Sequence, residues 1–331
     1  MSGILFYAHD PGGARAIAPL LPCFDEKLVF ARGYALDILP NALTLPDYAL
    51  LTFKPSFVIT GTSGDDFSER HMWKEAARLS IPSMAILDFW VNYGVRFSRY
   101  GVSQVHLFDG ECDYLPEFIC VMDEFAKEEM TKEGVPGERI LTFGNPHFEM
   151  IASRKTTATP KDSASGKRKI LFASQPFEGI YRKDSELIVL ETLIDAASKC
   201  NDLEIIIRKH PKEPDDKFAA YLNSWIFMDD INDSLDSIQT SELIVSESSM
   251  VLIEASFLGK KIISYQPKIK DGQYDFILTK NGSLPPITSS EEFERCFHRL
   301  IDQENNYFDN NITCTGIIDH ITDFVKERIH G

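Results

Sequence analysis

Residues 241–267, SELIVSESSMVLIEASFLGKKIISYQP, constrain the fold more than any other stretch of the chain. The pattern predicts a buried strand, a small polar turn, a helix and, after a glycine, a second strand. Ser248 and Ser249 stand where the helix should begin. The first backbone N–H groups of a helix have no partner within it, so small hydroxyl residues there suit a bound phosphate group. The segment therefore predicts a βαβ unit with an anion site at its turn.

Apolar strands alternate with helices along the whole chain, which is typical of parallel sheets covered on both faces. The strands expected are 3–8, 28–31, 56–60, 83–87, 118–122 and 139–143 in the first half, and 169–173, 203–207, 243–246 and 261–264 in the second. The other helices expected are 14–21, 67–79, 123–133, 184–198, 291–302 and 317–329. The fold class is therefore α/β, with two Rossmann-like domains.

A change of composition separates the two halves. Residues 152–169, ASRKTTATPKDSASGKRK, contain no large apolar side chain and have the character of a linker. We expect an N-terminal domain at 1–150, a linker at 151–168 and a second domain at 169–310. A C-terminal helix in 311–331 could pack back across the domains. Parallel sheets bind ligands beyond the carboxyl ends of their strands, so we expect a ligand cleft there.

Charge and composition exclude several classes of protein. A net charge of −16 disfavours nucleic acid or an anionic membrane as the main partner. The apolar runs are too short for a transmembrane segment, and the N-terminus, MSGILFYAHD, lacks the features of a secretory signal. The six cysteines, at 23, 112, 120, 200, 296 and 314, show no metal-ligand spacing and are expected to be reduced. We expect a cytoplasmic protein whose membrane association, if any, occurs through partners.

A second candidate anion contact follows the strand at 203–207, which ends in Arg208, Lys209, His210 and Pro211. A histidine at a strand end can carry charge near a phosphate, and its titration range suits acid catalysis. Arg208 could add positive charge. The alternative is a surface histidine in a basic run.

The serine turn and its neighbours complete this candidate site. An ordinary N-cap also explains Ser248 and Ser249, and the two roles are compatible. Glu254 lies in the apolar run MVLIEASFL, where an acid without a partner is unfavourable, so we interpret it as a ligand of ribose hydroxyls. Ser174 and Gln175 end the first strand of the second half and are expected to line the same site.

A substrate-binding segment is expected after the first strand of the chain. His9 and Asp10 follow that strand directly, and Gly12 and Gly13 permit close approach of a ligand. A carboxylate here could take a proton from an acceptor hydroxyl, so Asp10 is the predicted base and His9 the alternative. Asp10 could instead cap the following helix.

The loop after the fourth strand is rich in aromatic residues. Trp90 could stack on a sugar ring while Asp88 and Asn92 bind hydroxyl groups, which predicts a wall of the substrate site. Packing in the core is the alternative.

Two Asp-Asp pairs and the absence of three common motifs bear on metal and cofactor binding. The acidic pairs are interpreted as solvated. Asp65-Asp66 and Asp229-Asp230 lie in expected loops, so we assign no metal. A GxGxxG fingerprint, a GxxxxGK[ST] phosphate loop and a GxSxG elbow do not occur, which disfavours a dehydrogenase, a P-loop enzyme and the simplest α/β-hydrolase.

Taken together, these residues resemble the GT-B glycosyltransferase superfamily, and more narrowly the bacterial surface-polysaccharide transferases of the sialyl, Kdo and glycerophosphate types. The features that carry the resemblance are His210-Pro211, Ser248-Ser249, Glu254-Ala255, the strand at 260–264, the glycine-rich loop at 10–13 and the run GERILTFGNPHFE at 137–149.

The resemblance implies a glycosyltransferase that needs neither metal nor cofactor and acts in surface-polysaccharide synthesis, such as that of capsule or lipopolysaccharide. A CMP- or UDP-sugar donor would bind the second domain, and a glycan or lipid-linked acceptor the first. His210 and the serines would stabilise the departing phosphate, and Asp10 would act as base. The alternatives are a nucleotide-sugar 2-epimerase or hydrolase of the same fold, a CDP-polyol phosphotransferase, and a silent subunit of an assembly complex.

Overall fold

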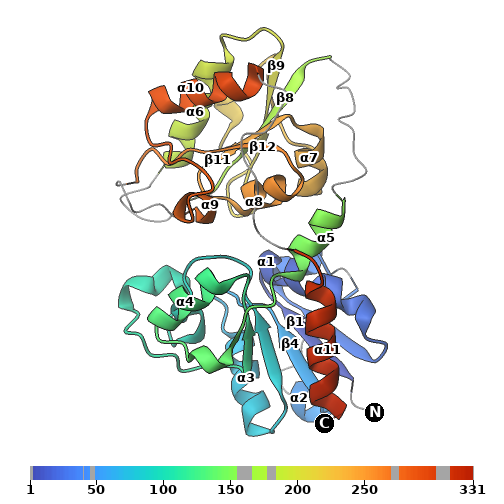
Figure 1. The fold of residues 1–331 in the computed structure, drawn as a ribbon. Helices are drawn as coiled ribbons and strands as arrows, with labels where there is room; N and C mark the ends of the chain where they lie inside the picture. Colours follow the sequence, from blue (N-terminus) through green and yellow to red (C-terminus); the bar gives the residue numbers. More distant parts are fainter. Residues whose placement is uncertain are drawn as a thin grey trace. The chain divides into compact units, whose positions relative to one another are not determined.

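The computed structural model describes residues 3–39, 41–44, 49–154, 166–176, 184–269, 276–302 and 314–330 of the chain. The chain divides into two compact units (Figure 1). The N-terminal unit comprises Met1–Met150 with Thr313–Gly331, and the C-terminal unit comprises Ile151–Ile312. Each contains one parallel sheet, so the expectation of an α/β fold with two such sheets is confirmed.

The sheet of the N-terminal unit has the order β3-β2-β1-β4-β5-β6-β7, and every neighbouring pair is parallel. Its strands are β1 Ile4–Ala8, β2 Lys27–Ala31, β3 Leu43–Thr44, β4 Phe57–Thr60, β5 Ser83–Ile86, β6 Phe118–Cys120 and β7 Ile140–Leu141. β1 and β4 are buried along their whole length because both faces of the sheet are covered, which explains their unbroken apolar sequences.

Helices surround this sheet. The α-helices are α1 Pro11–Ile17, α2 Ala49–Phe53, α3 Ser68–Arg78, α4 Glu124–Lys132, α5 Pro146–Arg154 and α11 Ile317–His330. The 3-10 helices are η1 Ala18–Cys23, η2 Gly33–Asp37, η3 Gly94–Phe97, η4 Val102–Leu107 and η5 Gly137–Arg139. None of the helices in the described ranges is long and apolar enough to cross a membrane.

The C-terminal helix α11 contacts the N-terminal unit. Glu149 accepts hydrogen bonds from the backbone amides of Gly316 and Ile318, at 2.6 and 2.7 Å, at the positive end of the helix. The ring of Phe324 packs edge-on against Phe118, with ring centroids 4.9 Å apart. These contacts fasten the last helix to the first unit of the chain.

The residues expected to form the linker are only partly described. Helix α5 continues to Arg154, and the first strand of the C-terminal unit begins at Arg168, so both ends of the expected linker are regular structure. Residues 155–165 lie outside the described residues.

The sheet of the C-terminal unit has the order β10-β9-β8-β11-β12 and is also parallel. Its strands are β8 Arg168–Ala173, β9 Leu203–Arg208, β10 Ile226–Met228, β11 Leu243–Ser246 and β12 Lys261–Ser264. Its helices are α6 Ser185–Ala197, η6 Ala219–Tyr221, α7 Ser234–Thr240, α8 Met250–Phe257, α9 Ile277–Lys280 and α10 Ser290–Asp302.

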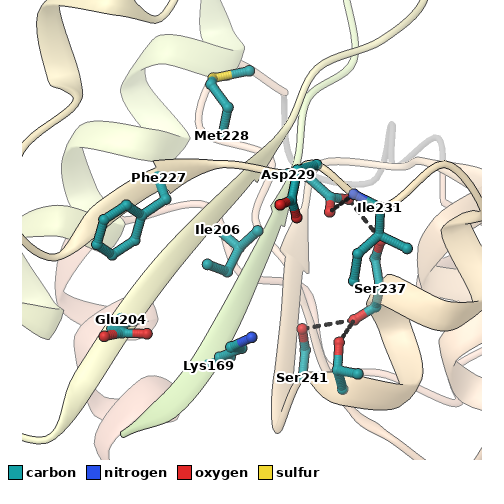
Figure 2. A pocket seen from close by; sticks show the side chains of 11 residues that line it. Lys169, Glu204, Ile206, Phe227, Met228, Asp229, Ile231, Ser237 and Ser241 are labelled. Atoms are coloured by element: carbon teal, nitrogen blue, oxygen red, sulfur yellow. Dashed lines mark hydrogen bonds between the residues drawn. The ribbon is translucent and has the colours of Figure 1, made fainter. Parts of the chain in front are cut away.

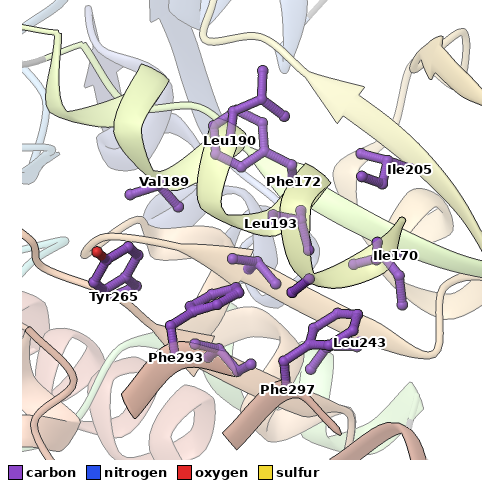
Figure 3. Packing of buried hydrophobic residues seen from close by; sticks show 14 of the residues in the cluster. Ile170, Phe172, Val189, Leu190, Leu193, Ile205, Leu243, Tyr265, Phe293 and Phe297 are labelled. Atoms are coloured by element: carbon purple, nitrogen blue, oxygen red, sulfur yellow. The ribbon is translucent and has the colours of Figure 1, made fainter. Parts of the chain in front are cut away.

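One face of this second sheet carries the main core of the unit (Figure 3). Ile170 and Ile205 are paired in register on neighbouring strands. They pack with Leu193 of α6 and with Phe293 and Phe297 of α10. The helices α7 and α8 contact the sheet separately, through β8 and through β11 and β12 respectively.

Each sheet has a topological switch point, where the connections of two adjacent strands leave in opposite directions. The N-terminal sheet has it between β1 and β4, and the C-terminal sheet between β8 and β11. Ligands of open α/β sheets bind beyond the carboxyl ends of such strand pairs.

Candidate active site

At the switch point of the C-terminal sheet, a side chain that follows β8 is hydrogen-bonded to the turn that follows β11. Gln175 follows β8, and its Oε1 accepts hydrogen bonds from both the backbone N–H and the hydroxyl of Ser248, each 3.2 Å long. Ser249 is the N-cap of α8, and its Oγ accepts from the amide of Val251 at 3.3 Å. The predicted position of the two serines at a helix start is correct, and capping accounts for the contact of Ser249.

Glu213, which the sequence analysis missed, joins two of the predicted site residues. Its carboxylate accepts from the backbone amide of His210 and from the hydroxyl of Ser174, both at 2.7 Å. Lys217 pairs with it at 2.7 Å and balances its buried charge. The only signal in the sequence was an acid three residues after His210. We call His210, Ser174, Gln175, Ser248 and Ser249 the C-terminal half-site.

His210 is partly buried at the end of β9. Burial lowers the pKa of its imidazole below the ordinary value of 6.5, and Lys212 and Lys209 lower it further against the opposing charge of Glu213. Its Nδ1 accepts from the amide of Lys212 at 3.2 Å. A bound phosphate would favour the charged form, so binding there would raise the pKa again.

Arg208, a second predicted phosphate contact, is engaged beside α7. Its guanidinium pairs with Asp229 at 2.6 Å and donates to the hydroxyl of Ser237 at 3.1 Å. This ion pair holds the ends of β9 and β10 to α7. A phosphate contact of Arg208 therefore stays a prediction.

Glu254 is completely buried on α8. Its Oε2 accepts from the hydroxyl of Ser234, at the start of α7, over 3.3 Å. This hydroxyl explains how the apolar segment accommodates an acid. The predicted ribose contact of Glu254 stays a prediction.

At the switch point of the N-terminal sheet, Asp10 faces the loop after β4. Its Oδ2 accepts from the amide of Gly64 at 3.1 Å, and its Oδ1 lies 2.9 Å from Nδ1 of His9. The second ring nitrogen of His9 lies 3.6 Å from Asp66. Asp10 precedes α1 but makes no side-chain cap hydrogen bond, so the capping alternative is wrong.

Asp88 lies beside the same loops. Its Oδ1 pairs with Arg96 at 3.1 Å. Burial raises the pKa of Asp88, Arg96 opposes that rise, and the charge of Asp10 adds to it. The two predicted carboxylates are therefore close enough to influence each other. We call His9, Asp10, Asp66 and Asp88, together with the buried Glu69 that is described below, the N-terminal half-site.

The two predicted glycines serve close packing of α1. A Cβ atom on Gly13 would lie 2.9 Å from the Cα of Gly61, and one on Gly12 would overlap the carboxylate of Asp88. The closeness of Gly13 and Gly61 brings the ends of β1 and β4 together. Ligand contact by Gly12 or Gly13 stays a prediction.

Glu69 is a buried acid that the sequence analysis missed. It is 1% exposed and accepts a hydrogen bond from the backbone amide of Ser63. Burial raises its pKa to about 7, Ser63 opposes the rise, and Asp10 adds to it. Its helical spacing from Met72, Trp73 and Ala76 places it on the buried face of α3, which was the available signal.

In the aromatic loop after β5, one predicted site residue lies in the core and another is partly exposed. Trp90 is 1% exposed, stacks on Phe148 with centroids 5.5 Å apart, and donates from Nε1 to Asp123 at 2.8 Å. The sugar-stacking interpretation of Trp90 is therefore wrong for this structure, because the ring belongs to the core. Asn92 is partly exposed and has a φ of +57°, a conformation that asparagine tolerates.

The acidic pairs are engaged in local contacts. Asp65 accepts from the amide and the hydroxyl of Ser103, both at 2.8 Å, and Asp229 pairs with Arg208. Among the described residues, no group of three or more His, Cys, Asp or Glu side chains is arranged to hold a metal ion.

Comparison with solved structures identifies the fold. The chain matches a UDP-N-acetylglucosamine 2-epimerase described as putative, from Listeria monocytogenes, with a TM-score of 0.70 and 14% identity over 100% of this chain and 97% of that one. It matches the Neisseria meningitidis UDP-GlcNAc 2-epimerase bound to UDP-GlcNAc with a TM-score of 0.66 and 15% identity over 98% and 100%. The glycotransferase of kitacinnamycin gives 0.57 and 12% identity over 99% and 96%.

No family model matches the sequence, and no curated protein matches it. The structural matches establish that the chain has the GT-B fold, as the resemblance implied.

Proposed function

We propose that the protein is a nucleotide-sugar 2-epimerase that acts on a UDP-linked N-acetylhexosamine. The fold is shared with structures of UDP-GlcNAc 2-epimerases, one bound to UDP-GlcNAc and another in complex with UDP-GlcNAc and UDP. In this proposal the C-terminal half-site binds the nucleotide diphosphate, and the N-terminal half-site carries out proton transfer at the sugar.

The carboxylates of the N-terminal half-site are the observation that carries the proposal. Inversion at carbon 2 begins when a base takes the C2 proton, the C–H electron pair forms a C1–C2 double bond, and UDP leaves carbon 1. Return of UDP to carbon 1 and of a proton to the opposite face of carbon 2 completes the inversion, so the reaction requires groups that accept and donate protons. Asp88 lies against Gly12, two residues after Asp10. Burial raises the pKa of Asp88, and the charge of Asp10 adds to that rise. His9 lies against Asp10 and orients it.

The chemistry of the C-terminal half-site suits a diphosphate. Ser248 and Ser249 surround the N-terminus of α8, where the first backbone amides and the helix dipole favour negative charge. His210 would add a proton donor to the bound phosphate. Ser174 and Gln175, which follow β8, would line the diphosphate site at the carboxyl end of that strand.

Glycosyl transfer is the second candidate, because a glycotransferase is also among the structural matches. In that reaction Asp10 would accept a proton from the acceptor hydroxyl. The reaction would belong to the synthesis of a bacterial surface polysaccharide, with a glycan or lipid-linked acceptor.

Proton NMR of UDP-GlcNAc incubated with the protein in D₂O tests the proposal. We expect exchange of the carbon-2 proton for deuterium and the appearance of the C2 epimer without any acceptor. Asp10→Asn and Asp88→Asn should abolish both signals, whereas Asp37→Asn, an exposed carboxylate of the same unit, should leave them unchanged. Release of UDP only when a glycan acceptor is added, with no exchange at carbon 2, would favour transfer instead.

A further inference from the structure

A pocket of about 310 Å³ lies within the C-terminal unit, on the face of the sheet beside α7 (Figure 2). Its floor is formed by β8, β9 and β10. Lys169 and Glu204 line it from the amino-terminal parts of β8 and β9, opposite each other in register. The C-terminal half-site follows the carboxyl ends of strands, so this pocket is a separate place on the unit.

Glu204 is the unusual side chain of the pocket. It is only 8% exposed, yet within the part of the chain that the structure describes its carboxylate accepts no hydrogen bond and pairs with no cation. Neither of its carboxylate oxygens is fully enclosed by protein atoms, so the carboxylate itself keeps contact with water although the rest of the residue is buried. Its remaining access is into the pocket, so the pocket presents a hydrogen-bond acceptor that a ligand could satisfy.

The other walls combine an aromatic surface with one cation. Phe227 is paired in register with Ile206, and its side chain is 41% exposed on the same face of the sheet as Glu204. Figure 2 shows Glu204, Ile206 and Phe227 on the neighbouring strands of the pocket floor. Lys169 supplies donors, and the exposed Asp230 supplies a further acceptor at the rim.

This combination selects among ligand classes. A phosphate or carboxylate ligand is disfavoured because Glu204 and Asp230 would repel it. A purely apolar ligand would leave Glu204 without a partner. A sugar ring carries hydroxyl groups that donate to a carboxylate and accept from an ammonium group, and its C–H face packs on an aromatic ring.

We propose that this pocket binds one ring of a neutral glycan, with Phe227 as the stacking surface and Glu204 as the acceptor for its hydroxyls. Its volume lies at the lower end of the range for small-ligand pockets. The site does not depend on the reaction proposed above, because none of its side chains belongs to either half-site.

Saturation-transfer and titration NMR on the full chain test this site, with maltose, cellobiose and N,N′-diacetylchitobiose as probes. We expect at least one of them to bind saturably with a Kd in the millimolar range. Phe227→Ala should weaken that binding at least fivefold and Glu204→Gln at least threefold. Leu222→Ala is the matched control, since Leu222 is also 41% exposed in this unit but does not line the pocket.

Three results would overturn the proposal. One is the absence of saturable binding by every probe, and another is an equal loss in Leu222→Ala and Phe227→Ala. The third is binding of spermidine that Phe227→Ala and Glu204→Gln weaken while the disaccharides do not compete, which would make the pocket a polyamine site. Phe227→Ala should leave UDP-GlcNAc binding unchanged, so a failure here is distinguishable from a failure of the proposed epimerase activity.

Discussion

Gly12 and Asp88 are in such close contact that a Cβ atom on Gly12 would lie 1.7 Å from Oδ2 of Asp88. Gly12→Ala must therefore displace the Asp88 carboxylate from its place beside Arg96. We expect the turnover of UDP-GlcNAc to fall at least tenfold while the chain stays folded, because the clash is with the end of a side chain. Circular dichroism and the NMR exchange assay measure the two effects.

Gly137→Ala is the control for that substitution. A Cβ atom there would meet its nearest neighbour, Oγ1 of Thr131, at 3.6 Å, which is ordinary contact. Equal turnover in Gly12→Ala and Gly137→Ala would remove Asp88 from the proposed chemistry.

Glu69 makes the stability of the N-terminal unit depend on pH. Its pKa of about 7 in the folded protein lies above the ordinary value of 4.5. Between these values the unfolded chain has released a proton that the folded chain keeps, so stability falls as pH rises and levels off above about pH 7. The total loss from this group is roughly 3 kcal/mol.

Glu69→Gln should remove that component, because the amide does not titrate and still accepts from Ser63. Urea unfolding at pH 5 and pH 8 measures it. We expect the stability of the variant relative to wild type to increase by roughly 2–3 kcal/mol between the two pH values. Parallel pH profiles of the two proteins would show that Glu69 is ionised normally.

Trp90 is predicted to matter for stability rather than for substrate binding. Trp90→Phe keeps the stacking on Phe148 but removes the donor to Asp123, which should cost about 1–3 kcal/mol in urea unfolding. The apparent KM for UDP-GlcNAc should stay the same. A raised KM without loss of stability would restore the substrate-wall interpretation.

The sequence predicted strands with continuous apolar runs well and missed two very short edge strands. The strands at 243–246 and 261–264 were predicted with the bounds observed for β11 and β12, because turns and a glycine delimit continuous apolar runs. The edge strands β3 and β10 have two and three residues and were missed, since so short a segment carries no periodicity. They exist because a neighbouring strand offers hydrogen-bonding groups. The two-residue edge strand β7 was found because it lies within the longer apolar run expected at 139–143.

Site residues could be predicted where neighbouring residues in the sequence fix their position, and could not where the contact joins distant segments. Positions fixed by local chemistry, such as Ser249 at a helix start, could be inferred from neighbouring residues. The link of His210 to Ser174 through Glu213 joins segments 39 residues apart and becomes visible only when β8 and β9 pair. Trp90 was ambiguous because an aromatic loop residue can face either the core or a ligand.

Binding of UDP-GlcNAc should strengthen as pH falls. The lowered pKa of His210 leaves it neutral near pH 8, and a diphosphate favours its protonated form, so binding takes up a proton. We expect calorimetry to show several-fold tighter binding at pH 6.5 than at pH 8. His210→Gln should flatten this dependence; a slope that persists in the variant would assign the proton to another group.

Calorimetric titration of UDP into wild type, His210→Ala and His298→Ala tests most directly whether the C-terminal half-site binds a nucleotide. His298 lies on α10 of the same unit, outside the half-site, and serves as the matched control. We predict one UDP per chain, binding weakened at least tenfold, or about 1.4 kcal/mol, by His210→Ala, and wild-type affinity in His298→Ala. Absence of UDP binding, or equal affinity in all three proteins, would contradict this assignment.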